Sequence, residues 1–288
     1  MIKNISKNIK LLSKPVVIEK NCDFSENRAI FISTEIGVPT ENIFNQGKQT
    51  NIQCKFMNNW IQINSKWYFI KQDLDYKGII NELLGVEITN HFGLKSANNI
   101  IAKIKKTNEL VIASENCLEE NKEYYSYNDL NIKKGNLEQV ITNIKNFCIK
   151  NNDTNYSLLN DIIKMTIRDL YSSDNDRHSN NFFIEKTNSQ YNLAPLFDYD
   201  QSFRSKNLLT HENVIMKIYL NSKDDREIIC NNIFFQEALN QLEEIDMNIL
   251  LNKIENKHNF KINDDIKNYY LSFDKNIKDK IKRFELGK

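Results

Sequence analysis

The stretch from Ser157 to Phe203 limits the folds open to this 288-residue chain more than any other part of its sequence. Apolar residues recur at helical spacing from Leu159 to Leu170, which predicts a helix with one buried face. A polar loop follows, and within it Asp176 and Asn181 lie five positions apart. The segment therefore predicts a buried helix that leads into a loop rich in acid and amide side chains.

A hairpin and another acidic residue come after the loop. Two short apolar runs, at 181–184 and 191–196, flank the turn-forming sequence EKTNSQ and predict two paired strands. Asp198 lies at the end of the second apolar run. The order along the chain is thus helix, polar loop, hairpin and acid.

Asp176, Asn181 and Asp198 are the residue types that phosphoryl transfer requires. One carboxylate orients the attacking hydroxyl and accepts its proton, while an amide oxygen and another carboxylate hold Mg²⁺ against the nucleotide phosphates. In protein kinases the catalytic aspartate and the metal-binding asparagine have the same separation as Asp176 and Asn181. We therefore assign Asp176 as the catalytic carboxylate that accepts the hydroxyl proton, and Asn181 and Asp198 as metal ligands. The alternative is a solvated polar loop, because asparagine is frequent throughout the chain.

The motif around Asp176 resembles that of one kinase family. It reads DRH, where protein kinases have HRD, and APLFD follows at 194–198. This combination is similar to the HipA-like serine/threonine kinases. The resemblance implies ATP and Mg²⁺ as cofactors and a serine or threonine hydroxyl of a protein as the acceptor.

The two residues after Asp176 are expected to support the loop. The resemblance implies that His178 holds the loop and the metal-binding segment in place, which is a structural role. Arg177 lies among several acids, so we expect a local ion pair with Asp174 or Asp200. A contact between Arg177 and a phosphate is the alternative.

Two elements upstream provide the other part of a nucleotide site. Residues 60–71 read as a hairpin that ends on Lys71, and 78–92 read as a helix with Glu82 one turn in and Gly93 at its end. Kinases use this arrangement, because a helix carboxylate steadies the strand lysine that contacts the α- and β-phosphates. The sequences YFIKQD and NELLGVEITNHFGL also resemble the corresponding HipA-like pattern.

The phosphate-binding loop is the least distinct part of this site. The chain has only seven glycines and no GxxxxGK[ST] sequence, so a Walker A loop is excluded. The segment from Gly47 to Asn51 is our candidate, with Gly47 and Thr50 next to the phosphates, because HipA-like kinases have a similarly sparse loop. An ordinary surface turn is the alternative.

These segments predict an α+β, two-lobed protein-kinase-like fold. A small antiparallel-sheet N-lobe would cover residues 1–116, and apolar runs at 99–104 and 110–114 would complete its sheet. A larger, mainly helical C-lobe would cover residues 117–288. Helical patterns in this lobe occur at 137–147, 228–242, 247–254 and 266–284.

The two ends of the predicted N-lobe carry weaker signals. The segment 115–118 would form the hinge between the lobes and bind adenine through its backbone, which assigns Glu115 and Cys117 to the nucleotide site. Residues 1–20 place isoleucine and leucine on one helical face and are expected to form a terminal helix or arm packed on the domain. A basic membrane anchor is the alternative for this stretch.

Composition restricts the partners. Lys+Arg number 39 and Asp+Glu 38, so the net charge of +1 gives no bulk attraction to nucleic acid, and none is expected as a direct partner. No apolar run approaches the ~20 residues of a membrane helix, so no membrane partner is expected. The five cysteines are scattered without CxxC spacing, which favours free thiols in a cytoplasmic protein.

Three interpretations stay open at this point. The resemblance spans about residues 60–203, and the chain is too short for the extra N-terminal subdomain of full-length HipA toxins, so a compact family member is expected. Such a kinase would be either a toxin paired with an antitoxin protein or a bacterial effector. A phosphatidylinositol-kinase-like enzyme also uses a DRHxxN loop, although Asp198-Tyr199-Asp200 replaces its usual Asp-Phe-Gly. The third alternative is a nucleotide-binding pseudokinase that acts as an interaction module.

Overall fold

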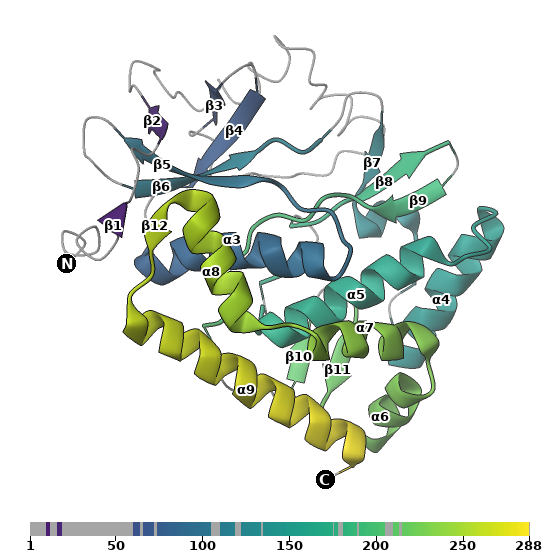
Figure 1. The fold of residues 1–288 in the computed structure, drawn as a ribbon. Helices are drawn as coiled ribbons and strands as arrows, with labels where there is room; N and C mark the ends of the chain where they lie inside the picture. The colour runs from purple at the N-terminus through teal and green to yellow at the C-terminus, as the bar shows by residue number, and fades with distance from the viewer. Residues whose placement is uncertain are drawn as a thin grey trace.

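The computed structural model describes most of the chain from residue 60 onward and two short segments before it. The described residues are 10–11, 16–18, 60–63, 66–71, 74–104, 110–118, 122–133, 135–174, 176–177, 181–188, 190–204, 210–212 and 215–287. Figure 1 shows a sheet-rich part resting on a larger, mainly helical part. In these segments no helix has both the length and the apolar character needed to cross a membrane.

A five-stranded sheet with the strand order β2-β5-β6-β4-β3 forms the sheet-rich part. Its strands are β2 (Val16–Ile18), β3 (Trp60–Ile63), β4 (Lys66–Lys71), β5 (Asn99–Ile104) and β6 (Leu110–Glu115). The pairs β3–β4, β4–β6 and β5–β6 are antiparallel, as predicted, and β3 and β4 form the expected hairpin. The strand β2 was not predicted, and it joins the edge of the sheet in parallel with β5.

Where the stretch 1–20 is described, it forms an arm packed on the domain, which is one of the two expected forms, and these described residues contain no helix. Residues 16–18 form β2, and β1 (Lys10–Leu11) pairs antiparallel with β12 (Phe260–Lys261). The apolar spacing in this stretch also suits short extended segments, and pairing with distant strands decides between the two.

The register of β4 determines which way Lys71 faces. Lys71 lies opposite Ile112 on β6, whereas Ile70 lies opposite Ala113. Side chains of directly paired residues project from the same face of a sheet. Ile112 belongs to the main hydrophobic core, while Ile70 and Ala113 belong to a small separate cluster. Lys71 therefore projects from the face of the sheet that packs on the main core.

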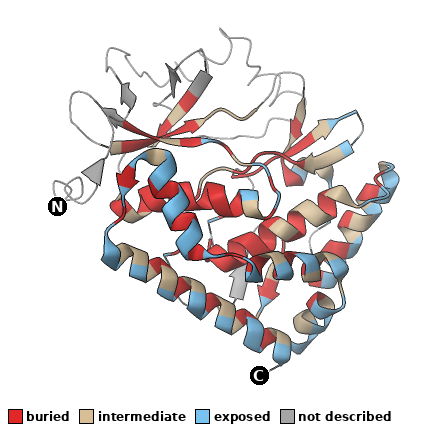
Figure 2. Cartoon of the chain, in the orientation of Figure 1, coloured by how far each residue is buried: buried red, intermediate tan, exposed pale blue. Residues whose placement is uncertain are grey.

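Helix α3 (Tyr76–His91) packs against that face. The Asp75 side chain caps its N-terminus by accepting a hydrogen bond from the Gly78 N–H at 2.7 Å, and Gly93 follows its end with φ of 70°. Nearly all of α3 is buried (Figure 2). Its buried residues include the polar Asn81 and Glu82. A helix buried on all sides lies inside a fold, so α3 is central to the molecule.

Among the described residues, the helical part has two α-helices before the β8–β9 hairpin and four after it. They are α4 (Leu137–Lys150), α5 (Ser157–Ser172), α6 (Lys223–Cys230), α7 (Ile233–Glu243), α8 (Met247–His258) and α9 (Asp264–Leu286). The prediction of a single helix over 228–242 is wrong, because α6 ends at Cys230 and α7 begins at Ile233. The Asn232 side chain accepts a hydrogen bond from the Phe234 N–H at 3.0 Å and so starts a new helix.

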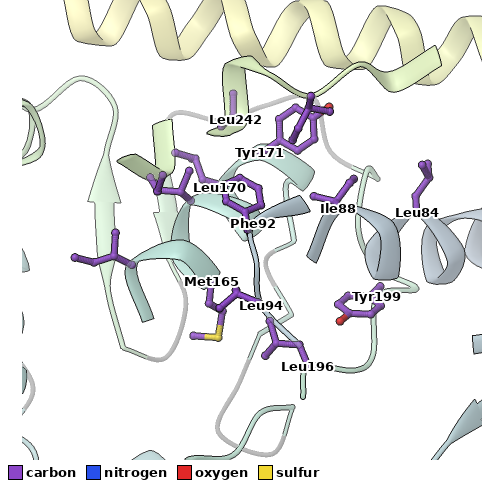
Figure 3. Close-up of a cluster of buried hydrophobic side chains, with 14 of the residues drawn as sticks. Leu84, Ile88, Phe92, Leu94, Met165, Leu170, Tyr171, Leu196, Tyr199 and Leu242 are labelled. Carbon is purple, nitrogen blue, oxygen red and sulfur yellow. The ribbon is translucent and has the colours of Figure 1, made fainter. Parts of the chain in front are cut away.

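One hydrophobic core joins α3 to the helical part. Figure 3 shows side chains of α3, α5 and the segment after the hairpin packed in one cluster, among them Ile88, Leu170 and Tyr199. The residues of this cluster are almost fully buried. Because α5 ends in this core, the polar loop that follows it starts from a fixed position.

The hairpin after the polar loop differs from the prediction in both strands, because the first strand lies further along the chain and the second strand ends earlier. Its strands are β8 (Ile184–Thr187) and β9 (Gln190–Leu193), and β7 (Glu123–Tyr125) pairs with β8 to complete a three-stranded sheet. Most of the predicted turn EKTNSQ is therefore strand. Asn188 adopts a left-handed conformation with φ of 49°, which allows a tighter turn than the sequence indicated.

Candidate active site

Three residues that are distant in sequence meet at the junction of β4 and α3. The Lys71 ammonium lies 2.5 Å from Glu82 Oε1 and 2.7 Å from Asp198 Oδ1. Glu82 is fully buried, while the Asp198 side chain is 33% exposed and opens the cluster to solvent. The predicted lysine, helix glutamate and metal-binding aspartate are therefore in direct contact.

The buried Glu82 carboxylate is held by three donors. Oε1 accepts hydrogen bonds from Lys71 Nζ and from the Tyr199 backbone N–H at 3.0 Å, and Oε2 accepts one from Asn99 Nδ2 at 2.9 Å. A buried carboxylate needs such partners because it has lost its hydration. Glu82 thus links the sheet, α3 and the segment of Asp198.

The two carboxylates keep Lys71 charged. Burial lowers the pKa of the Lys71 ammonium, but the negative charges and hydrogen bonds of Glu82 and Asp198 raise it more, so the pKa lies above its usual value. At neutral pH this site presents a fixed cation beside partly exposed carboxylates. Such a cation can contact an anionic group such as a phosphate.

Asp200 joins the same cluster, although the sequence analysis did not assign it to the metal. Oxygen atoms of Glu82, Asp198 and Asp200 lie within 4.8 Å of one another. Burial and the neighbouring Asp198 charge raise the pKa of the Asp200 carboxyl. The spacing Asp-x-Asp is the sequence signal that could have identified Asp200. Tyr199 between the two acids points into the core, so the two carboxylates can both point to the opposite side.

The backbone at this point is unusual. Asp198 has φ of 67°, a conformation that residues with a side chain rarely adopt. The turn at Asp198 coincides with the Lys71 contact, and the next residue donates its N–H to Glu82. Such strained positions concentrate at functional sites.

The polar loop places Asp176 and Asn181 close together. Asn181 is buried, and its Nδ2 donates to the Asp176 carbonyl at 2.9 Å. Asp176 is exposed, and its N–H donates to Asp174 Oδ1 at 3.3 Å. The loop therefore closes on itself and presents the Asp176 residue at the surface.

A buried ion network lies beneath the loop. Arg177 contacts Asp174 at 3.1 Å, as predicted, and Asp169 at 3.3 Å, which was not predicted. Arg168 contacts the same acids at 2.9 and 2.6 Å. Burial raises the pKa of Asp174, but the two arginines lower it more, so its pKa lies below the usual value. Arg168 and Asp169 lie on the buried helix α5, where a sequence pattern gives no sign of their pairing.

Comparisons with known proteins identify the fold. No protein-family model matches the sequence, and no curated protein matches it. The structure is similar to the crystal structure of the proinflammatory kinase CtkA of Helicobacter pylori, with a TM-score of 0.56 and 18% sequence identity. The match covers 79% of this chain and 92% of that chain. The chain has a protein-kinase fold.

A further structural match is weaker. HipA of Shewanella oneidensis MR-1, in a complex with HipB and operator DNA, matches with a TM-score of 0.44 and 12% identity. The match covers 76% of this chain and 57% of that chain, and its score is too low to establish a common fold. The predicted α+β kinase-like fold and the resemblance to a compact kinase are confirmed by the CtkA match.

The remaining predicted site residues either do not belong to the cluster of Lys71 and the three acids or lie outside the described residues. Glu115 ends β6, and its N–H donates to the Asn98 carbonyl at 2.8 Å. Burial raises the pKa of the Cys117 thiol to about 12, so this cysteine is not a reactive thiolate at neutral pH. Gly47, Thr50 and His178 lie outside the described residues.

Proposed function

We propose that this chain transfers the γ-phosphoryl group of ATP to a serine or threonine hydroxyl of a protein, in a reaction that depends on Mg²⁺. The observation that carries the proposal is the contact of Lys71 with both Glu82 and Asp198. The structural similarity to the kinase CtkA supports it, because protein kinases bind the nucleotide with a strand lysine, a helix glutamate and a metal-binding aspartate.

In this mechanism Lys71 contacts the nucleotide phosphates, and Glu82 holds Lys71 in position. Glu82 can do so because it is fully buried and fixed by Asn99 and the Tyr199 N–H. A lysine held on one side by a buried carboxylate loses little conformational freedom when an anion binds on the other side. We assign the adenine contacts to the backbone at Glu115 and Cys117, and the phosphate loop to the segment with Gly47 and Thr50.

Asp176 would act on the acceptor. The hydroxyl oxygen forms a bond with the γ-phosphorus, the bond from that phosphorus to the β–γ bridging oxygen breaks, and ADP leaves. The hydroxyl proton passes to the Asp176 carboxylate. The exposure of Asp176 supports this role, since a protein substrate must reach it. His178 is assigned to the support of this loop.

Oxygen-rich side chains support the assignment of a metal site. Asp198 and Asp200 offer carboxylate oxygens in one cluster, and Asn181 offers an amide oxygen, which are donors that suit Mg²⁺. Bound Mg²⁺ would neutralise negative charge on the phosphate oxygens. We propose Asn181 and Asp198 as ligands, with Asp200 as an additional carboxylate ligand.

A labelling experiment tests the proposal. The purified chain is incubated with Mg²⁺ and γ-labelled ATP, in one arm with a bacterial protein extract and in another with vesicles that contain phosphatidylinositol. We expect label on protein serine or threonine, and none with Asp176→Asn. Label on lipid alone would instead identify a lipid kinase. Mg-ATP binding without any transfer, even to the chain itself, would identify a pseudokinase.

Two further assignments belong to the proposal. The antitoxin partner rests on the sequence resemblance, and the cytoplasmic location rests on the five scattered cysteines. Co-purification of the chain with the product of a neighbouring gene is the direct measurement of the partner.

A further inference from the structure

The Arg177 side chain connects two segments that carry the proposed metal ligands. It donates five hydrogen bonds and is fully buried. Three of the bonds go to the carboxylates of Asp169 and Asp174. The other two leave Nη1 and reach the backbone carbonyls of Asn181 at 3.1 Å and Phe197 at 2.7 Å.

The positions of these two carbonyls are informative. One belongs to Asn181 itself, and the other belongs to the residue directly before Asp198. The β8–β9 hairpin separates the two segments in sequence. A single nitrogen atom thus fixes the end of the polar loop relative to the start of the Asp198 turn.

The acids behind Arg177 fix the guanidinium in turn. Asp169 lies on α5, and Asp174 follows its end, so both extend from a helix that is packed in the core. The planar guanidinium of an arginine has its donors in a rigid fork, so once the two acids hold it, it also holds the two carbonyls in place. A lysine ammonium on its flexible stem would hold them less precisely.

We infer that Arg177 is a positioning residue, which holds the backbones of Asn181 and Asp198 at the separation needed to bind one Mg²⁺ between them. This inference rests on the proposed function. It assigns Arg177 no contact with substrate. Partners that orient metal ligands in this indirect way commonly contribute about 10- to 100-fold to metal affinity or activity.

Arg168 provides a matched control. It is as buried as Arg177 and contacts the same two acids through Nη1. Its Nε and Nη2 have no hydrogen-bond partner among the residues that the structure describes, so it reaches neither carbonyl. Replacement of Arg168 removes its ion pairs and its packing over the Tyr199 ring at 4.4 Å, but it removes neither of the two carbonyl hydrogen bonds, which Arg177 makes.

The experiment compares Arg177→Lys with Arg168→Lys. Thermal unfolding reports the structural cost of each substitution, and calorimetry measures the affinity for ADP with saturating Mg²⁺ and with EDTA. We expect both variants to unfold at lower temperature. Only Arg177→Lys should lose about 10-fold or more of the gain in ADP affinity that Mg²⁺ provides. The corresponding loss for Arg168→Lys should stay within about twofold, since its side chain donates to neither of the two carbonyls.

Two outcomes would overturn the inference. In the first, Mg²⁺ increases the ADP affinity of Arg177→Lys to within about twofold of the increase in the wild type. In the second, Arg177→Lys and Arg168→Lys lose this increase in ADP affinity to the same extent. If Arg177→Lys does not fold, Asp169→Asn is measured instead, because this variant weakens two of the five hydrogen bonds of Arg177. An unchanged Mg²⁺-dependent gain in that variant would also overturn it. A wild-type protein that binds no Mg-ADP would instead contradict the proposed function itself.

Discussion

Tyr199 packs directly against the backbone of α3 at Gly85. A β-carbon at Gly85 would lie 2.2 Å from Cγ of Tyr199, so only glycine permits this approach. On the same helix, Thr89 Oγ1 donates to the Tyr199 hydroxyl at 3.2 Å, and Glu82 accepts from the Tyr199 N–H. Tyr199, labelled in Figure 3, therefore fixes the segment of Asp198 and Asp200 against α3.

Gly85→Ala should destabilise the protein by about 1–3 kcal/mol, because the added methyl group overlaps the buried Tyr199 ring. Urea unfolding measures this change. Gly78→Ala on the same helix is the control, since its added carbon would meet only the ends of side chains: Asp75 at 3.0 Å, and Arg204 and Leu74 at 3.4 Å. Equal stability of the two variants would show that Tyr199 moves aside without cost.

Lys71→Met should reduce phosphoryl transfer by about 10²–10³-fold, because the site loses its fixed cation. The rate with labelled ATP measures the effect. Lys77→Met is the control, since Lys77 lies over the Tyr269 ring at 3.8 Å and outside the acidic cluster. If Lys71→Met retained more than a tenth of the wild-type rate, Lys71 would not be the phosphate contact.

Asp176→Asn should lower the transfer rate by about 10²–10⁴-fold while the affinity for Mg-ADP stays near that of the wild type. The substitution removes the proton acceptor and leaves the proposed metal ligands intact. Single-turnover kinetics and calorimetry on the same preparation test both parts. A parallel loss of nucleotide affinity would indicate that Asp176 helps to bind Mg-ADP and is not the proton acceptor.

Asp200→Asn should weaken the Mg²⁺-dependent part of nucleotide binding, and Asp198→Ala should weaken it more, because Asp198 also contacts Lys71. Calorimetry with and without Mg²⁺ measures both. Asp75→Asn is the control: Asp75 caps α3 outside the cluster, and asparagine is an equally good cap. If only Asp198→Ala has an effect, Asp200 is not a ligand.

Asp161→Asn should stabilise the protein at pH 8 but not at pH 3.5. Burial raises the pKa of the Asp161 carboxyl to about 6 from a usual value of 3.8, so its ionisation opposes folding as pH rises through this window. Above the window the difference is at most about 3 kcal/mol. Urea unfolding at the two pH values measures it. Equal effects at both would show that the gain has another cause.

Local patterns predicted the elements that have strong periodicity. The hairpin of β3 and β4, the central helix α3 and the buried helix α5 follow from apolar spacing and capping residues, which act within a few positions. The prediction failed where two local readings compete. Asn232 starts a new helix in the middle of a helical pattern, and β8 extends through residues expected to form a turn.

The amino-acid sequence by itself determined the residue types of the candidate site and the order in which they occur: a strand lysine, a helix glutamate, and an acid and amide in one loop before a further acid. Only the tertiary structure decided how they converge. Lys71 and Asp198 are 127 positions apart, and their contact depends on sheet register and on the packing of Tyr199 against α3. The ion network beneath the loop also depends on tertiary packing, because Arg168 and Arg177 both lie over the Tyr199 ring, and no local pattern encodes that arrangement.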